Sequence, residues 1–69
     1  MILAEFLDVI DDDCVLTIYY KTSNKGIDRL KSRAMDIPVL FIKERVKYIE
    51  PDFGTGDYYI YLNGAINRK

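Results

Sequence analysis

The sequence predicts a small α+β domain in which an N-terminal helix packs on an antiparallel sheet of about four strands. Apolar residues follow helical spacing over residues 2–10, and four later segments are predicted to be strands from their strand-favouring residues or their alternation. Turn residues join those segments into two hairpins. A strongly twisted sheet of this kind would form a curled half-barrel. With 69 residues the chain has room for one domain, which we place at residues 1–64, with a frayed tail at 65–69.

The helix is predicted from four apolar residues at positions i, i+3, i+4 and i+7. They are Leu3, Phe6, Leu7 and Ile10. The helix should end near Ile10, because carboxylates are unfavourable at the negative end of a helix dipole and the next three residues are aspartates. Aspartates also favour a turn.

Residues 14–21 predict the first strand, with Leu16 and Ile18 on the face toward the core and Tyr19 on the opposite face. A polar turn, TSNKG, follows. Residues 27–34 alternate small and basic side chains, which is typical of an amphipathic strand, although a helix also fits this segment.

Asp36 before Ile37 and Pro38 is typical of a helix start, so residues 39–44 are predicted to form one or two helical turns or, alternatively, a buried strand. Residues 46–52 and 58–63 predict two strands, and the loop FGTGD between them indicates a hairpin. In the last strand, Tyr58, Ile60 and Leu62 share one face, and Tyr59 and Tyr61 share the other.

The composition argues against most enzyme classes. The chain has no histidine and one cysteine, Cys14, which lies on the predicted inward face. It therefore lacks the commonest general base, the commonest transition-metal ligand and any intramolecular disulfide. The glycine loop at 54–56 leads into a strand, whereas a phosphate-binding loop leads into a helix. We expect no enzyme activity, no cofactor and no resident metal.

The aspartate triplet, Asp11, Asp12 and Asp13, has three interpretations. The spacing lacks the alternating ligands and glycine of a calcium loop, which disfavours a metal site. A solvated turn that ends the helix is favoured, and an acidic patch that contacts a partner is the main alternative.

The strand pattern places three tyrosines and a valine on the sheet face away from the helix: Tyr19, Tyr59, Tyr61 and Val15. Tyrosine is enriched at interfaces, so this face predicts a homodimer, a higher oligomer or another protein partner. Two alternatives stay open, an aromatic face that only shields the backbone and a nucleic-acid surface. The nucleic-acid surface would use the bases Lys21, Lys25, Arg29, Lys31 and Arg33. The net charge of −1 and the pI of 5.2 argue against this alternative.

The segments LAEFLDVIDDDCVLTIY, MDIPVLFIKERVKYIE and YYIYL resemble a loose class of small proteins from phages and mobile elements of Firmicutes. The resemblance covers residues 3–62 and carries over no catalytic residue. Some small proteins of this kind inhibit bacterial defence systems, including anti-CRISPR proteins. Together with the small size, the absent catalytic chemistry and the aromatic face, the resemblance predicts a non-enzymatic, self-associating interaction protein that inhibits a host defence protein.

A small nucleic-acid-binding module is the alternative function, and a third possibility is a pocket that sequesters a nucleotide at a subunit interface.

Glu5 and Asp8 interrupt the apolar N-terminus, which is therefore not typical of a signal peptide. No apolar run approaches the ~20 residues of a membrane span. We expect a protein of the bacterial cytoplasm without a membrane partner.

Overall fold

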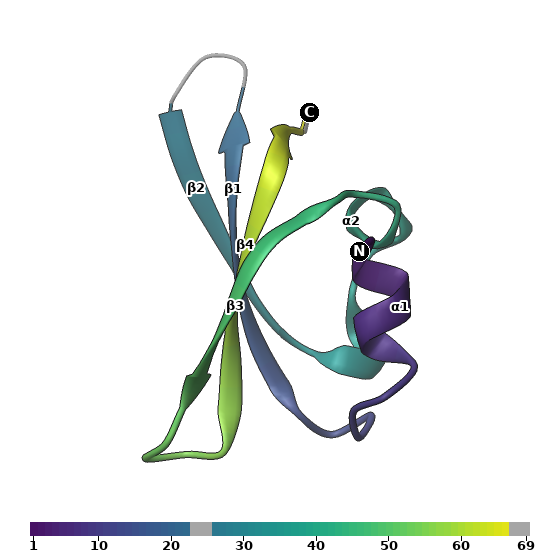
Figure 1. The fold of residues 1–69 in the computed structure, drawn as a ribbon, viewed down its shortest axis with the longest axis vertical. Coiled ribbons are helices and arrows are strands. Elements are labelled where there is room, and N and C mark those ends of the chain that lie inside the picture. Colours follow the sequence, from purple (N-terminus) through teal and green to yellow (C-terminus); the bar gives the residue numbers. More distant parts are fainter. Residues whose placement is uncertain (23–25, 67–69) are drawn as a thin grey trace.

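The structure is a computed structural model that describes residues 1–22 and 26–66. It confirms the α+β class. In chain order the elements are α1 (Leu3–Leu7), β1 (Val15–Thr22), β2 (Gly26–Arg33), the 3₁₀ turn η1 (Ala34–Asp36), α2 (Val39–Ile42), β3 (Val46–Asp52) and β4 (Asp57–Ala65). The strands form one sheet, and both helices lie on the same side of it (Figure 1).

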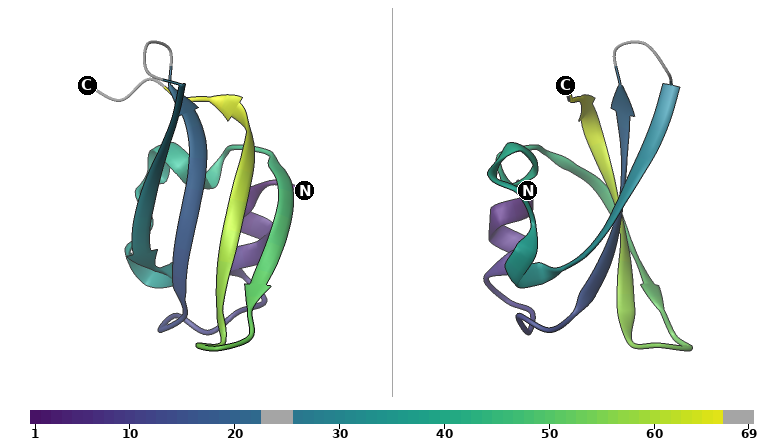
Figure 2. Two further views of the ribbon diagram at one scale, coloured as in Figure 1. Left: turned by 90° about the vertical axis from the view of Figure 1, so that its left-hand side faces the viewer. Right: turned by 180° about the vertical axis from the view of Figure 1, so that it is seen from behind.

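The sheet has the strand order β2-β1-β4-β3. Both predicted hairpins are confirmed, since β1 pairs with β2 and β3 pairs with β4 in antiparallel fashion. The prediction of a wholly antiparallel sheet is wrong at its centre, where β1 and β4 run parallel. Residues 34–45 cross over the helical side between the hairpins, and a long crossover of this kind allows parallel strands to pair. The sheet is strongly twisted but does not close (Figure 2).

Helix α1 is shorter than predicted, and helix α2 begins at a different N-cap residue. α1 ends at Leu7 rather than near Ile10, with Asp8 at its C-cap, and the backbone N–H of Ile2 donates to Glu5 Oε1 at 2.8 Å. Asp36 does not begin the second helix. It ends η1, where its carboxylate accepts a hydrogen bond from Arg33 Nε at 3.2 Å, and Pro38 takes the N-cap position of α2.

The structure resolves the two secondary-structure alternatives that the sequence left open. Residues 26–33 form a strand, and residues 39–42 form a helix. The three central residues of the turn predicted between β1 and β2, 23–25, lie outside the described residues, as do residues 67–69 of the predicted tail. β4 continues to Ala65, beyond the predicted end at 63, and the buried Ile66 donates its N–H to the carbonyl of Lys21 at 2.8 Å.

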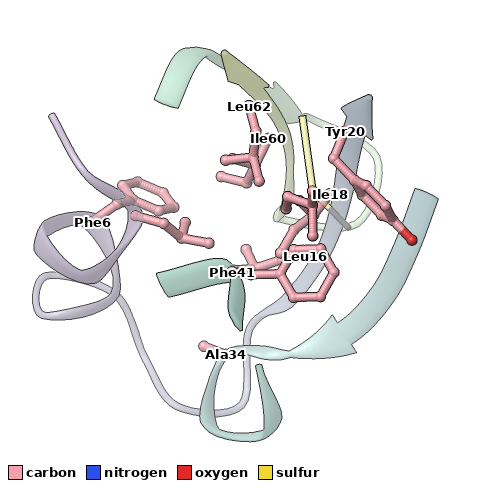
Figure 3. Close-up of a cluster of buried hydrophobic side chains, with 10 residues drawn as sticks. Phe6, Leu16, Ile18, Tyr20, Ala34, Phe41, Ile60 and Leu62 are labelled. Carbon is pink, nitrogen blue, oxygen red and sulfur yellow. The ribbon is translucent and has the colours of Figure 1, made fainter. Parts of the chain in front are cut away.

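The core lies between the sheet and the helices and is drawn in Figure 3. Its buried side chains are Leu3, Phe6, Leu16, Ile18, Tyr20, Ala34, Phe41, Ile60, Leu62 and Ile66. Two aromatic edge-to-face contacts connect the layers, Phe6 with Tyr58 at 5.3 Å and Phe41 with Tyr20 at 5.0 Å. Over the described ranges, no helix is long and apolar enough to cross a membrane.

Candidate functional site

The candidate site is the outer face of the sheet, which we define as the side opposite α1 and α2. It faces the viewer in the left panel of Figure 2, with the helices behind the strands. Strand alternation directs Leu16, Ile18 and Tyr20 inward, where all three are buried. The residues between them therefore point to the outer face. The structure thus places Val15, Tyr19, Tyr59 and Tyr61 together on this face, as the sequence pattern indicates, and their contact role stays a prediction.

Three tyrosines from neighbouring strands form a row across the outer face, which we call the tyrosine row: Tyr19, Tyr61 and Tyr48. Tyr61 pairs in register with Tyr19 on one side and with Tyr48 on the other. The ring of Tyr61 stacks on Tyr19 at 4.9 Å and 13°, and on Tyr48 at 4.2 Å and 17°. Because Tyr61 lies on the strand between the other two, both faces of its ring are covered. Such cross-strand aromatic pairs stabilise a sheet by roughly 0.2–1 kcal/mol each.

Sequence reasoning missed Tyr48, which a β-bulge brings into the row. Val46 pairs with Leu62 and Tyr48 pairs with Tyr61, so Lys47 is the extra residue in β3. Regular alternation from Val46 would turn Tyr48 toward the core, and the bulge reverses this. The spacing of Val46 and Ile49 contained the relevant information, since two core residues three apart in one strand are incompatible with a period of two.

Asp52 connects the β3–β4 turn to the outer face. Its Oδ1 accepts the N–H of Gly54 at 3.0 Å, and its Oδ2 accepts the hydroxyl of Tyr59 at 3.0 Å. These hydrogen bonds, the one from Gly54 first, lower the pKa of Asp52, and the bond to the carboxylate raises the pKa of Tyr59. The pKa of Tyr61 is also raised, first by desolvation and then by the nearby charge of Glu50. The phenols of Tyr59 and Tyr61 therefore stay protonated at neutral pH.

The outer face carries opposite charges on its two sides. The outward positions of β2 form the basic side, which consists of Arg29, Lys31 and Arg33. Across the sheet, outward positions of β3 and β4 form the acidic side, which consists of Glu50, Asp52 and Asp57. Arg33 also forms an ion pair with Asp36 at 3.2 Å, and both side chains are 54% exposed, so the pair contributes little to stability.

The remaining predicted bases lie apart from this charge pattern. Lys21 is exposed on β1 at the end of the face near the predicted turn between β1 and β2, and Lys25 lies outside the described residues. Beside Lys21 a hollow of about 450 Å³ opens, lined by the tyrosine row together with Lys47, Ile27 and Asn63 among others. It lies where β3 and β4 depart from regular register, and such irregularities bend a strand and locally disrupt its pairing.

The aspartate triplet forms a turn, as expected. The N–H of Cys14 donates to the carbonyl of Asp11 at 3.1 Å, and the N–H of Met35 donates to the carbonyl of Asp12 at 3.2 Å. All three carboxylates are exposed, and their role as an acidic contact patch stays a prediction. In residues 1–22 and 26–66, no three His, Cys, Asp or Glu side chains gather in a way that could hold a metal ion.

The turn of the triplet lies at the same end of the sheet as the β3–β4 hairpin (Figure 1). Phe53 at the tip of that hairpin is 94% exposed. The glycine loop 54–56 is this hairpin turn and leads into β4, so the hairpin interpretation is confirmed over the phosphate loop. The hydroxyl of Thr55 accepts the N–H of Asp57 at 3.3 Å within the same turn.

No protein-family model matches the chain, and no curated protein or solved structure is significantly similar to it.

Proposed function

We propose that this protein is a non-enzymatic binding protein whose outer sheet face is a protein-contact surface. The observation that supports this most is the tyrosine row, which lies between a basic and an acidic side on a sheet face that no other described element covers. Tyrosine combines a large apolar ring with a polar tip and is enriched in interface cores.

The stacking geometry favours a protein partner over nucleic acid. Proteins that bind single strands stack bases on free ring faces. In the tyrosine row, both ring faces of Tyr61 are covered by its neighbours, as is one face each of Tyr19 and Tyr48. The acidic side would in addition repel phosphates along half of the surface. The face therefore offers mainly ring edges and hydroxyl groups, which suit the polar and apolar mixture of a protein surface.

The resemblance to small phage and mobile-element proteins indicates which partners to test first. We propose a bacterial defence protein as the target, held by a scaffold that needs no active site. The exposed turn of Asp11, Asp12 and Asp13 is the candidate contact for such a target, since it lies outside the outer face and stays accessible when that face is covered.

Site-specific photo-crosslinking in bacterial cells tests the contact surface. A benzophenone side chain at Thr17, between the charged sides of the outer face, should form crosslinks to protein, and these should disappear when Tyr61→Asp is added. The matched control is the same probe at Val39, which is 65% exposed on the helical side. Crosslinks from Val39 alone would contradict the proposal.

Single-stranded nucleic-acid binding is the second candidate function. One observation favours it, the pairing of Arg29 directly opposite Tyr19, which sets a cation beside an aromatic ring. A labelled single-stranded oligonucleotide should show no binding if the leading proposal holds. Binding that weakens steeply with salt and is lost in an Arg29→Ala, Lys31→Ala double variant would support the alternative.

A further inference from the structure

We infer that the partner of the outer face is a second copy of this chain, packed face to face about a two-fold axis parallel to the strands. β2 of each copy then lies over β3 of the other. This inference rests on the proposed function, because it names the partner of the same surface.

The strand register aligns the outer face in three rows that each run from the basic side to the acidic side. In the order β2, β1, β4, β3 they are Arg33–Val15–Asp57–Asp52, Lys31–Thr17–Tyr59–Glu50 and Arg29–Tyr19–Tyr61–Tyr48. Every row therefore begins with a cation, and two of the three end with a carboxylate. The third ends with an aromatic ring, which also attracts cations.

Two-fold symmetry selects one arrangement of two such faces. Rotation about an axis parallel to the strands exchanges the two sides of the sheet and keeps each row at its own level. Lys31 then faces Glu50 of the second copy, Arg33 faces Asp52 and Arg29 faces the ring of Tyr48. Every contact occurs twice, as in any isologous interface. An axis across the strands would instead place β2 over β2, and like charges would oppose each other.

These charges are not matched across the sheet within one chain. Lys31 and Glu50 are three strand spacings apart, or about 14 Å at the usual separation of strands. The ion pair that the structure shows on the basic side joins Arg33 to Asp36, which is not part of the acidic side. A second copy supplies the complement of both sides at once and covers the tyrosine row in the centre.

The size of the face indicates a weak dimer. Seven residues of four strands span roughly 23 by 19 Å, so two copies would bury on the order of 1,000 Å² in total. That value lies at the low end for specific interfaces. We therefore expect a dissociation constant in the micromolar range, with tyrosines in the interface core and charges at its rim.

Charge reversal with exchange tests the arrangement. Lys31→Glu and Glu50→Lys each place like charges opposite each other, so each variant alone should shift toward monomer in sedimentation velocity. The runs would use protein concentrations on the order of 100 μM, above the expected dissociation constant. The double variant should regain the dimer. An equimolar mixture of the two single variants should form a heterodimer, because both of its charge pairs are then opposite in sign.

The controls are Lys43→Glu and Asp8→Lys, exposed reversals outside the outer face, which should leave the dimer unchanged. Circular dichroism verifies that each variant is folded. A wild-type monomer at every concentration, or single variants that dimerise like the wild type, would overturn the inference. So would weakened single variants whose mixture stays monomeric. A monomer that still forms Thr17 crosslinks to other proteins would overturn the second copy alone and leave the proposed function supported.

Discussion

Asp52 shows how one side chain can join a turn to a surface. Its two oxygens accept the backbone of Gly54 and the hydroxyl of Tyr59, so the carboxylate fixes the hairpin turn and a tyrosine of the outer face together. Both bonds favour the ionised carboxylate and the protonated phenol. The Asp52 contribution to stability is therefore present above about pH 4 and lost as the pH falls through its lowered pKa. The Tyr59 contribution is present below about pH 10 and lost as the pH rises through its raised pKa.

Asp52→Asn removes the charge that raises the pKa of Tyr59, so that pKa should fall toward its ordinary value of 10.0. The pKa of Tyr61 should move little, because desolvation is its main cause and Asp52 is not among the others. Titration of the tyrosine ring carbons by NMR measures both. An unchanged Tyr59 would show that the carboxylate does not hold its hydroxyl in solution.

At the level of residues, alternation was sufficient to assign the faces of β1 and β4. Leu16, Ile18 and Tyr20 lie in the core, and Tyr19 lies outside it. Alternation failed for Tyr48, because a bulge interrupts it: the spacing of Val46 and Ile49 indicates an interruption, but only the pairing with β4 places it at Lys47. The charge complement was also hidden. The basic run was visible in the sequence, whereas Glu50, Asp52 and Asp57 come together only through the register of two strands.

Among the elements, the β3–β4 hairpin depends on one glycine conformation. Gly56 has φ +78°, a backbone conformation that residues with a Cβ rarely adopt. Gly54 does not have a positive φ. We predict that Gly56→Ala lowers the free energy of unfolding by about 1–2 kcal/mol. Gly54→Ala is the matched control and should cost less, since its Cβ would meet Asp52 Oδ1 at 3.4 Å, an ordinary contact. Urea denaturation measures both, and equal losses would contradict the conformational explanation.

The short helix α2 depends on one buried side chain. Phe41 is fully buried, whereas Val39 and Leu40 are exposed. Phe41→Ala should cost roughly 3–5 kcal/mol, which is most of the stability expected for a domain of this size. Val39→Ala should change it by less than ~0.5 kcal/mol. Thermal unfolding followed by circular dichroism compares the two variants. If Phe41→Ala unfolds cooperatively with a Tm near that of the wild type, this dependence is contradicted.

The hairpins were predictable as elements because their turns and alternation are local. The parallel pairing of β1 with β4 was not, since local patterns do not specify which strands of two hairpins meet. Composition gave an indirect indication. β2 contributes only Leu30 and Ser32 toward the core over most of its length, which suits an edge strand, whereas β1 and β4 carry the buried residues of central strands.

For the whole molecule, self-association predicts a Tm that depends on protein concentration. A ligand that binds only the folded state stabilises it by about 2.7 kcal/mol at a hundredfold excess over its dissociation constant. A homodimer gains about half of this, because its free-monomer concentration rises only as the square root of the total concentration. We therefore expect the Tm to rise by about 5–10 °C between micromolar and hundred-micromolar protein. Differential scanning fluorimetry measures this, with Lys31→Glu as the comparison that should lose the dependence. A Tm that does not vary with concentration would argue for a monomer.

The position of Phe53 at the same end of the sheet as the aspartate turn has a consequence for any larger complex. A two-fold axis parallel to the strands does not exchange the two ends of the molecule. The proposed dimer would therefore be bivalent at one end, where the two β3–β4 turns, each with an exposed Phe53, and the two acidic turns all lie. A target with two matching sites would gain avidity from both copies at once, because the second contact forms at a high effective concentration.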